Sequence, residues 1–374
     1  MTARRARELG IRTGRGEPGP FNAITDVPGV RVGNATLIEG QGDLVVGSGP
    51  VRTGVTVIVP HDGDIWREPV FAGCHRLNGN GELTGLEWIR ESGTLSSLIA
   101  LTNTHSVGVV RDALVAQAVA GRDPRESYWA LPVVGETWDG VLNDINGFHV
   151  KSEHVEQALA GAGSGPVTEG NVGGGTGMIC HGFKGGIGTA SRVVDVDAGG
   201  YTVGVLVQAN HGHRDRLRVN GVPVGEEISA SVAPLPQGPS ASEGTGSIIV
   251  VVATDAPLLP NQCARLAQRA GFGIARTGGV GEHTSGDLFV AFAVGNRGLP
   301  GSASVPGSSV TIPLRMLSNA HINPMFDAVV EATEEAILNA LLGAETMTGR
   351  DFITAYRLDS DRLLSVIRRH GRAS

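Results

Sequence analysis

The sequence has few of the residues that mark several common classes of protein. Aromatic residues make up 4% and charged residues 18% of its 374 residues, and the net charge is −7 without an extended basic patch. We therefore do not expect nucleic acid as a partner. The three cysteines, Cys74, Cys180 and Cys263, lie far apart, fit no CxxC metal pattern and cannot all pair. This usage favours a reducing compartment.

Long hydrophobic runs are also missing. The first ten residues (MTARRARELG) are basic, but no apolar segment follows them, so they predict neither a signal peptide nor a membrane span. We expect a soluble, cytoplasmic protein with no membrane partner.

Glycine is the residue in excess, with 56 copies, against an ordinary share of about 7%. No three-residue period runs through these glycines, which excludes a collagen-like chain. Hydrophobic residues amount to 41%, enough for a sizeable core. Helical and strand-like segments are mixed without the regular spacing of a parallel doubly wound sheet. These features predict closely packed layers joined by tight turns.

Ser247 lies where a pliable Gly-Thr-Gly loop (244–246) meets an unbroken β-branched run (248–252), which predicts a buried strand. A serine held there can attack the carbonyl of Gly246. Cleavage of that bond would leave Ser247 with a free α-amine, whose pKa of about 7.7–8.0 suits a general base. The small, Pro-rich stretch 229–246 before it is typical of a processing loop. The alternative is an ordinary loop-to-strand transition that happens to contain a serine.

Two other segments carry polar residues next to predicted strands. Glu136 follows a predicted strand that begins at 131, and the alternative is a solvated turn residue. His211, His213 and Asp215 follow the predicted strand 201–210; without a further spaced His or Cys, a polar loop is favoured over a metal site.

The Gly-rich segment 169–191 contains Lys184 but lacks both the Walker spacing and the strand-turn-helix context of a dinucleotide site. We interpret it as a strand pair packed against another backbone, not as a nucleotide-binding loop.

Six separated motifs resemble one family when they are taken together. They are ITDVPGVRVG (24–33), GETWDG (135–140), EGNVGGGTGM (169–178), VQANHG (207–212), GTGS (244–247) and SGD (285–287). The chain is similar over nearly its full length to the DmpA-type L-aminopeptidase D-esterase/D-amidases, which include the β-peptidyl aminopeptidases.

The resemblance implies an α+β fold, a four-layer αββα sandwich similar to N-terminal-nucleophile hydrolases but with different strand connectivity. It implies a single catalytic domain, 1–374, that cuts itself into 1–246 and 247–374 between Gly246 and Ser247. The resemblance implies that Ser247 is the nucleophile and that the cut units assemble into a homotetramer. No cofactor or metal is implied.

The resemblance also assigns roles to individual residues. Asn210 matches the asparagine that stabilises the oxyanion, Ser285 and Asp287 match the pair that orients the nucleophile, and Glu136 matches the acid that binds the substrate ammonium. Trp138 stands where a tyrosine is expected near the oxyanion. An indole N–H donates a hydrogen bond but cannot accept one or exchange a proton.

The implied reaction is release of N-terminal residues from short peptides, amino-acid amides or esters through an acyl-enzyme. β-Amino acids and D-Ala derivatives are among the substrates that the resemblance allows. Two alternatives share the fold, an acyltransferase of the ornithine acetyltransferase type and a non-catalytic binding protein. The first uses threonine in place of Ser247, and the second would stay uncut.

Overall fold

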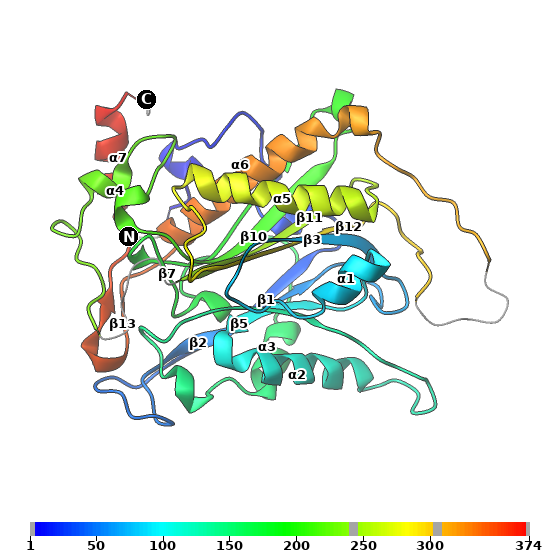
Figure 1. Cartoon of the computed structure of the whole chain (residues 1–374), viewed down its shortest axis with the longest axis horizontal. Helices are drawn as coiled ribbons and strands as arrows, with labels where there is room; N and C mark the ends of the chain where they lie inside the picture. Colours follow the sequence, from blue (N-terminus) through cyan, green and yellow to red (C-terminus); the bar gives the residue numbers. More distant parts are fainter. Residues whose placement is uncertain (1–3, 239–245, 302–308, 372–374) are drawn as a thin grey trace.

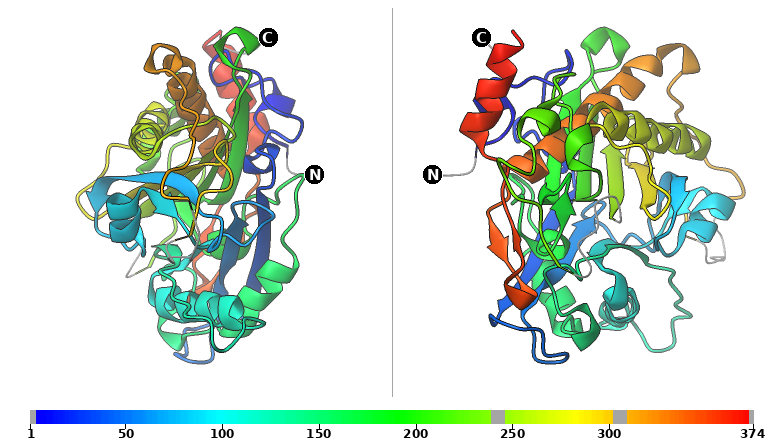
Figure 2. Two further views of the ribbon diagram at one scale, coloured as in Figure 1. Left: turned by 90° about the vertical axis from the view of Figure 1, so that its right-hand side faces the viewer. Right: turned by 60° about the vertical axis from the view of Figure 1, so that its left-hand side comes forward.

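Two β-sheets lie face to face between two pairs of helices, so the chain has four layers (Figure 1). The computed structural model describes residues 4–238, 246–301 and 309–371. Both views of Figure 2 show one helix pair at one end of the molecule and the second pair at the other. The predicted α+β class and αββα layering are confirmed.

The larger sheet carries the strand that begins at Ser247. Its order is β4 (Thr94–Leu95), β3 (Val70–Gly79), β12 (Gly286–Ala293), β11 (Ser247–Thr254), β10 (Thr202–Asn210) and β9 (Gly186–Val193). β11 and β12 are parallel, and the other neighbours are antiparallel.

The smaller sheet has the order β1 (Arg31–Glu39), β2 (Val51–Val59), β5 (Ile99–Asn103) and β6 (Val133–Thr137), with β5 and β6 parallel. Two short hairpins lie outside the sheets, β7 (Ile179–Cys180) with β8 (Phe183–Lys184), and β13 (Met347–Thr348) with β14 (Thr354–Ala355).

Helices cover the outer face of each sheet. α5 (Pro260–Arg276) and α6 (Asn323–Leu342) pack on the larger sheet, and α2 (Val107–Val119) and α3 (Ser152–Ala160) pack on the smaller one (Figure 1). The peripheral helices are α1 (Leu86–Ser92), α4 (Val224–Glu227) and α7 (Ser360–Arg369). Single-turn 3₁₀ helices occur at Arg7–Leu9, Ile24–Asp26, Thr104–Ser106, Ile145–Gly147, Gly173–Gly175, Val196–Ala198, Arg214–Arg216, Asn319–His321 and Arg350–Phe352.

Burial on both faces explains why the central strands are continuous apolar runs. Every residue of β2 and of β11 is buried, because one face meets the other sheet and the opposite face meets helices. One apolar cluster lies between the sheets, with Leu101, Val133 and Ile249 among its members. A second cluster lies between the larger sheet and its helices, and a third lies between the smaller sheet and its helices.

Glycines allow these layers to approach closely, as the composition predicts. A Cβ at Gly188 in β9 would lie 2.0 Å from the carbonyl oxygen of Ala336 in α6. A Cβ at Gly73 in β3 would lie 2.2 Å from the backbone nitrogen of Ala264 in α5. Each outer helix of this pair therefore rests on a strand where no side chain separates the backbones.

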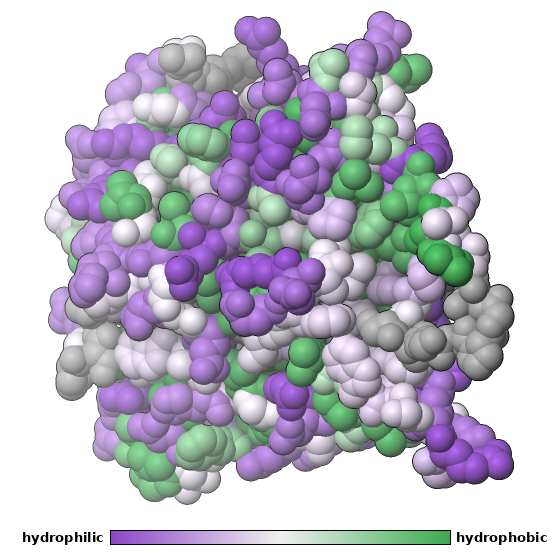
Figure 3. All heavy atoms as spheres, turned by 45° about the vertical axis from the view of Figure 1, so that its right-hand side comes forward, coloured by the Kyte–Doolittle hydropathy of each residue, from purple (hydrophilic) through white to green (hydrophobic). Residues whose placement is uncertain are grey.

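Hydrophilic residues alternate with smaller hydrophobic groups on the face shown in Figure 3. Within the described residues, no helix is long and apolar enough to cross a membrane.

Candidate active site

Three separate segments meet at the end of the larger sheet where β11 begins. Ser247 is the first residue of β11 and pairs with Asn210, the last residue of antiparallel β10. On the other side, Ile248 pairs with Asp287 at the start of parallel β12. Sheet register alone therefore places Asn210, Ser247 and Asp287 side by side. All are nearly inaccessible: Ser247 and Asn210 are 5% exposed, Asp287 2% and Ser285 1%.

The hydroxyl of Ser247 is held by the first residue of β12. The backbone N–H of Gly286 donates a hydrogen bond to Ser247 Oγ at 2.9 Å. The neighbouring Ser285 hydroxyl donates to Asp287 Oδ1 at 2.6 Å. Burial raises the pKa of Asp287 to about 6, against the lowering effect of the Ser285 hydrogen bond. The Ser-Gly-Asp motif thus holds the serine oxygen and places a carboxylate one strand away.

Asn210 presents its amide nitrogen to the residue that precedes the nucleophile. Its Oδ1 accepts a hydrogen bond from the N–H of Ile179 at 2.7 Å, and its Nδ2 donates to the carbonyl of Trp138 at 3.0 Å. These partners fix which end of the amide is the donor. Nδ2 also lies 3.1 Å from the point where a Cβ on Gly246 would sit. One N–H thus remains for an oxyanion at that position.

The residue before the predicted cut, Gly246, has no room for a side chain. A Cβ there would lie 1.6 Å from the carbonyl oxygen of Asn210, an impossible contact with backbone. Gly244 and Thr245, together with the rest of 239–245, lie outside the described residues. The predicted processing loop is therefore described only over 229–238 and at Gly246.

Glu136 lies inside β6 and not on a solvated turn. It is 3% exposed; its Oε1 accepts the N–H of Glu82 at 2.9 Å, and its Oε2 accepts the hydroxyl of Thr104. Burial raises its pKa, while the Thr104 hydrogen bond opposes the rise. Gly81 lies between this carboxylate and Gly286, the residue that binds Ser247 Oγ. A Cβ on Gly81 would lie 3.0 Å from Glu136 Oε1 and 3.2 Å from Gly286 Cα. The Glu136 alternative of a turn residue is thus wrong.

Trp138 meets Asn210 through its backbone. Its carbonyl accepts the Asn210 amide, whereas its half-buried ring lies against Gly140, whose Cβ would be 2.6 Å from the indole. Asn210 is thus bound by the backbone carbonyl of residue 138, and this contact does not depend on whether the side chain there is a tryptophan or the expected tyrosine.

Lys184 is a buried cation whose role the sequence did not indicate. It is completely buried and donates hydrogen bonds to the carbonyls of Gly175, Met178 and Gly185. Burial lowers its pKa to about 7. The ammonium of Lys184 therefore binds backbone carbonyls of its own Gly-rich segment and does not point at a bound phosphate. This arrangement agrees with our rejection of a phosphate-binding loop. A lysine in a Gly-rich segment was the available sequence signal for this residue. That signal does not distinguish a lysine that binds backbone carbonyls from one that binds a ligand.

The residues after β10 separate in the structure. His211 lies in the loop that follows β10, but it is buried, whereas His213 is half-buried and Asp215 is exposed. The ring of His211 faces two residues from the β7–β8 hairpin, Cys180 and His181. His213 and Asp215 do not belong to this group.

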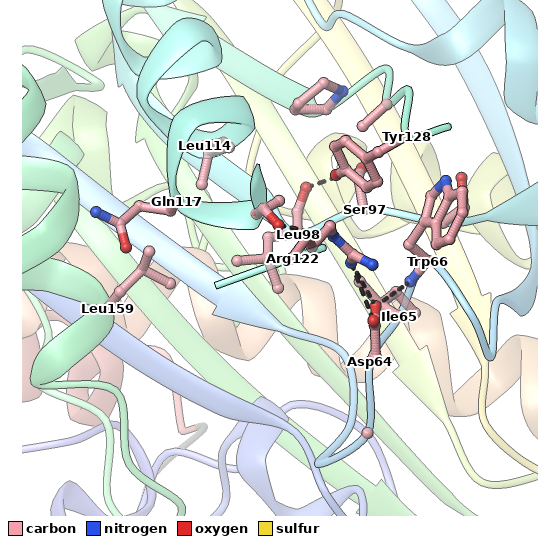
Figure 4. A pocket seen from close by; sticks show the side chains of 15 residues that line it. Asp64, Ile65, Trp66, Ser97, Leu98, Leu114, Gln117, Arg122, Tyr128 and Leu159 are labelled. Carbon is pink, nitrogen blue, oxygen red and sulfur yellow. Dashed lines mark hydrogen bonds and ion pairs between the residues drawn. The ribbon is translucent and has the colours of Figure 1, made fainter. Parts of the chain in front are cut away.

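A pocket of about 290 Å³ lies at the opposite ends of β5 and β6 from Glu136, since Leu98 and Pro132 precede those strands (Figure 4). The guanidinium of Arg122 bonds to both oxygens of Asp64 at 2.9 and 3.0 Å and lies over the ring of Tyr128. The charge of Arg122 is already paired, so Arg122 does not offer this pocket a free cation for a substrate.

Comparisons with known proteins point to one kind of enzyme. The model of "Peptidase family S58" matches residues 22–355. The β-peptidyl aminopeptidase BapA of Sphingosinicella microcystinivorans is 50% identical over 376 residues, which cover 98% of this chain and 93% of that protein. A β-aminopeptidase from a Burkholderia species has a TM-score of 0.90 at 56% identity, covering 98% of this chain and 99% of that one.

A third similar protein extends the comparison to the fold. The L-aminopeptidase D-Ala-esterase/amidase of Ochrobactrum anthropi has a TM-score of 0.89 at 44% identity, with 99% of each chain covered. It is described as a prototype for the serine aminopeptidases and as a new variant of the N-terminal-nucleophile hydrolase fold. The four layers described above are those of this variant.

Proposed function

The chain belongs to peptidase family S58 and is an aminopeptidase of the serine type, and from that premise we propose that it activates itself by cutting the Gly246–Ser247 bond. The family resemblance inferred from the motifs is thereby confirmed. The relatives are aminopeptidases, so neither an acyltransferase nor a binding protein is supported. The observation that carries the proposal is the arrangement of Asn210, Ser247 and Asp287 on three adjacent strands.

The first reaction is an attack by Ser247 Oγ on the carbonyl carbon of Gly246. The peptide nitrogen leaves as the new α-amine of Ser247, and water then hydrolyses the ester to a Gly246 carboxylate. The close approach of Asn210 to Gly246 supports a role for its Nδ2 in holding the oxyanion. Losing one such donor typically costs about 2.7–4 kcal/mol of transition-state stabilisation.

In the cut enzyme the same hydroxyl attacks the first carbonyl of a substrate. The Ser247 amine takes the proton from Oγ, and the Ser285–Asp287 pair holds that amine in place. An acyl-enzyme forms, the leaving amine receives the proton, and water releases the acyl group. No step uses a metal ion.

We propose Glu136 as the group that binds the ammonium of the substrate. It is buried, its burial raises its pKa, and it is one glycine away from the residue that holds Ser247. The relatives' names extend the proposed substrates to short peptides with an N-terminal β-amino acid. Amides and esters of amino acids, including D-Ala, are proposed with them.

Assembly and location complete the proposal: one catalytic domain, in the cytoplasm, as a homotetramer of cut units. Val310, Ile312, Leu314 and Met316 are all exposed and recur at every second residue, which supports an apolar contact between copies. The three cysteines are all free, in keeping with a reducing compartment. Light scattering during gel filtration measures the assembly directly, and a monomer would contradict it.

Mass spectrometry of the purified protein tests the proposed self-cleavage. Wild type should consist of fragments 1–246 and 247–374, and Ser247→Ala should remain one inactive chain. Ser231→Ala, which changes an exposed serine in the preceding stretch, should be cut like wild type. Splitting of Ser247→Ala at the same bond would show that another protease makes the cut.

A further inference from the structure

A thiol and two imidazoles meet in the interior beside Asn210. Cys180 ends β7, His181 lies in the turn to β8, and His211 directly follows β10; all three are buried. Their ligand atoms lie within 4.8 Å of one another, and Cys180 Sγ is 3.8 Å from His211 Nδ1. Within the described parts of the chain, no other such group of three His, Cys or acidic residues occurs.

The hydrogen bonds of His181 leave a lone pair in this group. Its Nδ1 lies 2.9 Å from the carbonyl oxygen of His213, which can only accept, so Nδ1 carries the proton. Nε2 is then an unprotonated nitrogen, and it is buried without a hydrogen-bond partner among the residues that the structure describes. An imidazole that donates one N–H to a backbone carbonyl and leaves the other nitrogen free is the usual form of a metal-ligating histidine. His211 points its Nδ1 at the Cys180 thiol, at 3.8 Å, and its Nε2 is buried without a partner among the described residues.

The backbone around His181 is held in an unusual conformation that presents the ring. His181 has φ 48°, in the left-handed region where few residues other than glycine are found. The N–H of His181 donates to the carbonyl of His211 at 2.7 Å. The carbonyl of His181 accepts a hydrogen bond from Arg214 Nε at 2.9 Å. Gly212 makes room for the ring, since a Cβ there would lie 2.4 Å from it. A buried polar side chain at a strained, well-braced turn points to function more than to packing.

We propose that Cys180, His181 and His211 form a binding site for a zinc ion. One thiolate and two neutral imidazoles match the ligands that zinc takes in proteins. Cys180 Sγ, His211 Nδ1 and His181 Nε2 would bind, at about 2.3 Å for sulfur and about 2.0–2.1 Å for nitrogen, with the fourth position left to water. Binding forms a Zn–S bond and releases the proton of the Cys180 thiol.

The ion would act on the neighbouring asparagine. Ile179, whose N–H holds Asn210 Oδ1, precedes Cys180, and His211 follows Asn210 in the chain. Zinc must draw ligand atoms now up to 4.8 Å apart closer together, and this movement shifts both supports of Asn210. We therefore infer that zinc slows turnover and that activity does not need it. This inhibition rests on the proposed function, whereas the binding does not.

The test measures zinc binding on the full protein after treatment with EDTA. Wild type is incubated with zinc, desalted and analysed for bound metal, and Co²⁺ is used in parallel to detect thiolate ligation by its absorption. The variants are Cys180→Ser and His181→Asn, since asparagine tolerates the left-handed backbone that His181 adopts. Cys263→Ser is the matched control, because Cys263 is an equally buried thiol that contacts the carbonyl of Phe71.

We expect about one zinc per chain in wild type and in Cys263→Ser, and at least about tenfold weaker binding in the other two variants. Equal zinc in wild type and Cys180→Ser would overturn the site. Turnover, measured relative to each variant's own metal-free rate, should fall with zinc in wild type and not in Cys180→Ser. Zinc bound at the site without slower turnover would refute the effect on Asn210, whereas absence of turnover in metal-free protein would count against the proposed function alone.

Discussion

Glu136 is a carboxylate removed from water, and within the described residues it accepts two hydrogen bonds, from the Glu82 N–H and the Thr104 hydroxyl. Burial of a charge is costly unless a partner compensates it. A substrate ammonium supplies such a partner through a charge-assisted hydrogen bond. The carboxylate is therefore suited to recognise a free amino end, which separates an aminopeptidase from a general amidase.

Glu136→Gln should lower kcat/KM for free-amine peptides by at least about thirtyfold, since breaking a buried charged pair costs about 2–5 kcal/mol. Self-cleavage should be unaffected, because the Gly246–Ser247 bond brings no ammonium to Glu136. Glu82→Gln, at the exposed neighbour that donates through its backbone, should have little effect. Steady-state kinetics with free and N-acetylated peptides measures this, and near-normal turnover in Glu136→Gln would refute the role.

Asp287 makes stability depend on pH. Burial raises its pKa to about 6 in the folded chain, from 3.8. The folded state therefore keeps a proton that the unfolded state loses as pH rises above about 4. The resulting stabilisation is full below pH 4, falls as pH rises through 6 and is absent above that. A shift of about two units corresponds to about 3 kcal/mol.

The uncut Ser247→Ala chain should thus lose stability between pH 4 and pH 7, and the loss should be smaller in Ser247→Ala with Asp287→Asn, by up to about 3 kcal/mol. Urea unfolding at each pH gives both values. Asp139 and Glu169, whose pKa values burial raises to about 7, contribute in the same direction in both proteins and cancel in the comparison. Identical pH dependence in the two proteins would contradict the buried state of Asp287.

At the scale of elements, β9 and α6 touch backbone to backbone at Gly188. Gly188→Ala should destabilise the uncut chain by about 1–3 kcal/mol, because its Cβ overlaps the Ala336 carbonyl and the helix must move. Gly108→Ala in α2 is the matched control: apart from the neighbouring turns of its own helix, no described atom lies within 4 Å of the added Cβ, and alanine favours a helix over glycine by up to about 1 kcal/mol. Denaturant unfolding of both variants measures the difference, and equal stabilities would show that the layers yield easily.

Local patterns predicted several of the strands. The predicted strand 201–210 forms β10 except for its first residue, and the β-branched run 248–252 lies within β11. The segment 169–191 forms the β7–β8 hairpin and most of β9, as the strand-pair interpretation requires.

The site was harder to predict where it depends on contacts between distant segments. Ser247 and Asn210 stood at strand ends in the sequence, but their pairing is a matter of sheet register. The burial of Glu136 and Lys184 comes from the packing of one layer on another, which no local pattern contains. The meeting of Cys180 with His211 likewise needs the hairpin to fold beside β10.

At the scale of the whole molecule, the proposed cut divides the larger sheet in an unusual way. β11 and β12 would belong to fragment 247–374, yet they lie between β10 and β3 of fragment 1–246. Every residue of both inserted strands is buried. Burying one large apolar side chain contributes about 1.5–3 kcal/mol, so the two fragments are held by much of the core.

The two fragments should therefore purify together and separate only in denaturant. Gel filtration in buffer and in urea, followed by mass spectrometry of the peaks, measures this. Loss of either fragment in buffer alone would contradict the arrangement of β11 and β12 in the sheet.

The insertion of β11 and β12 also changes what kind of reaction refolding is. Before the cut, the chain recovers its sheet by a unimolecular process whose rate does not depend on protein concentration. After the cut, two separate polypeptides must find one another, and the strands of each have no complete sheet to join until they do. The lifetime of the active enzyme then depends on how slowly it opens and not on how readily it refolds.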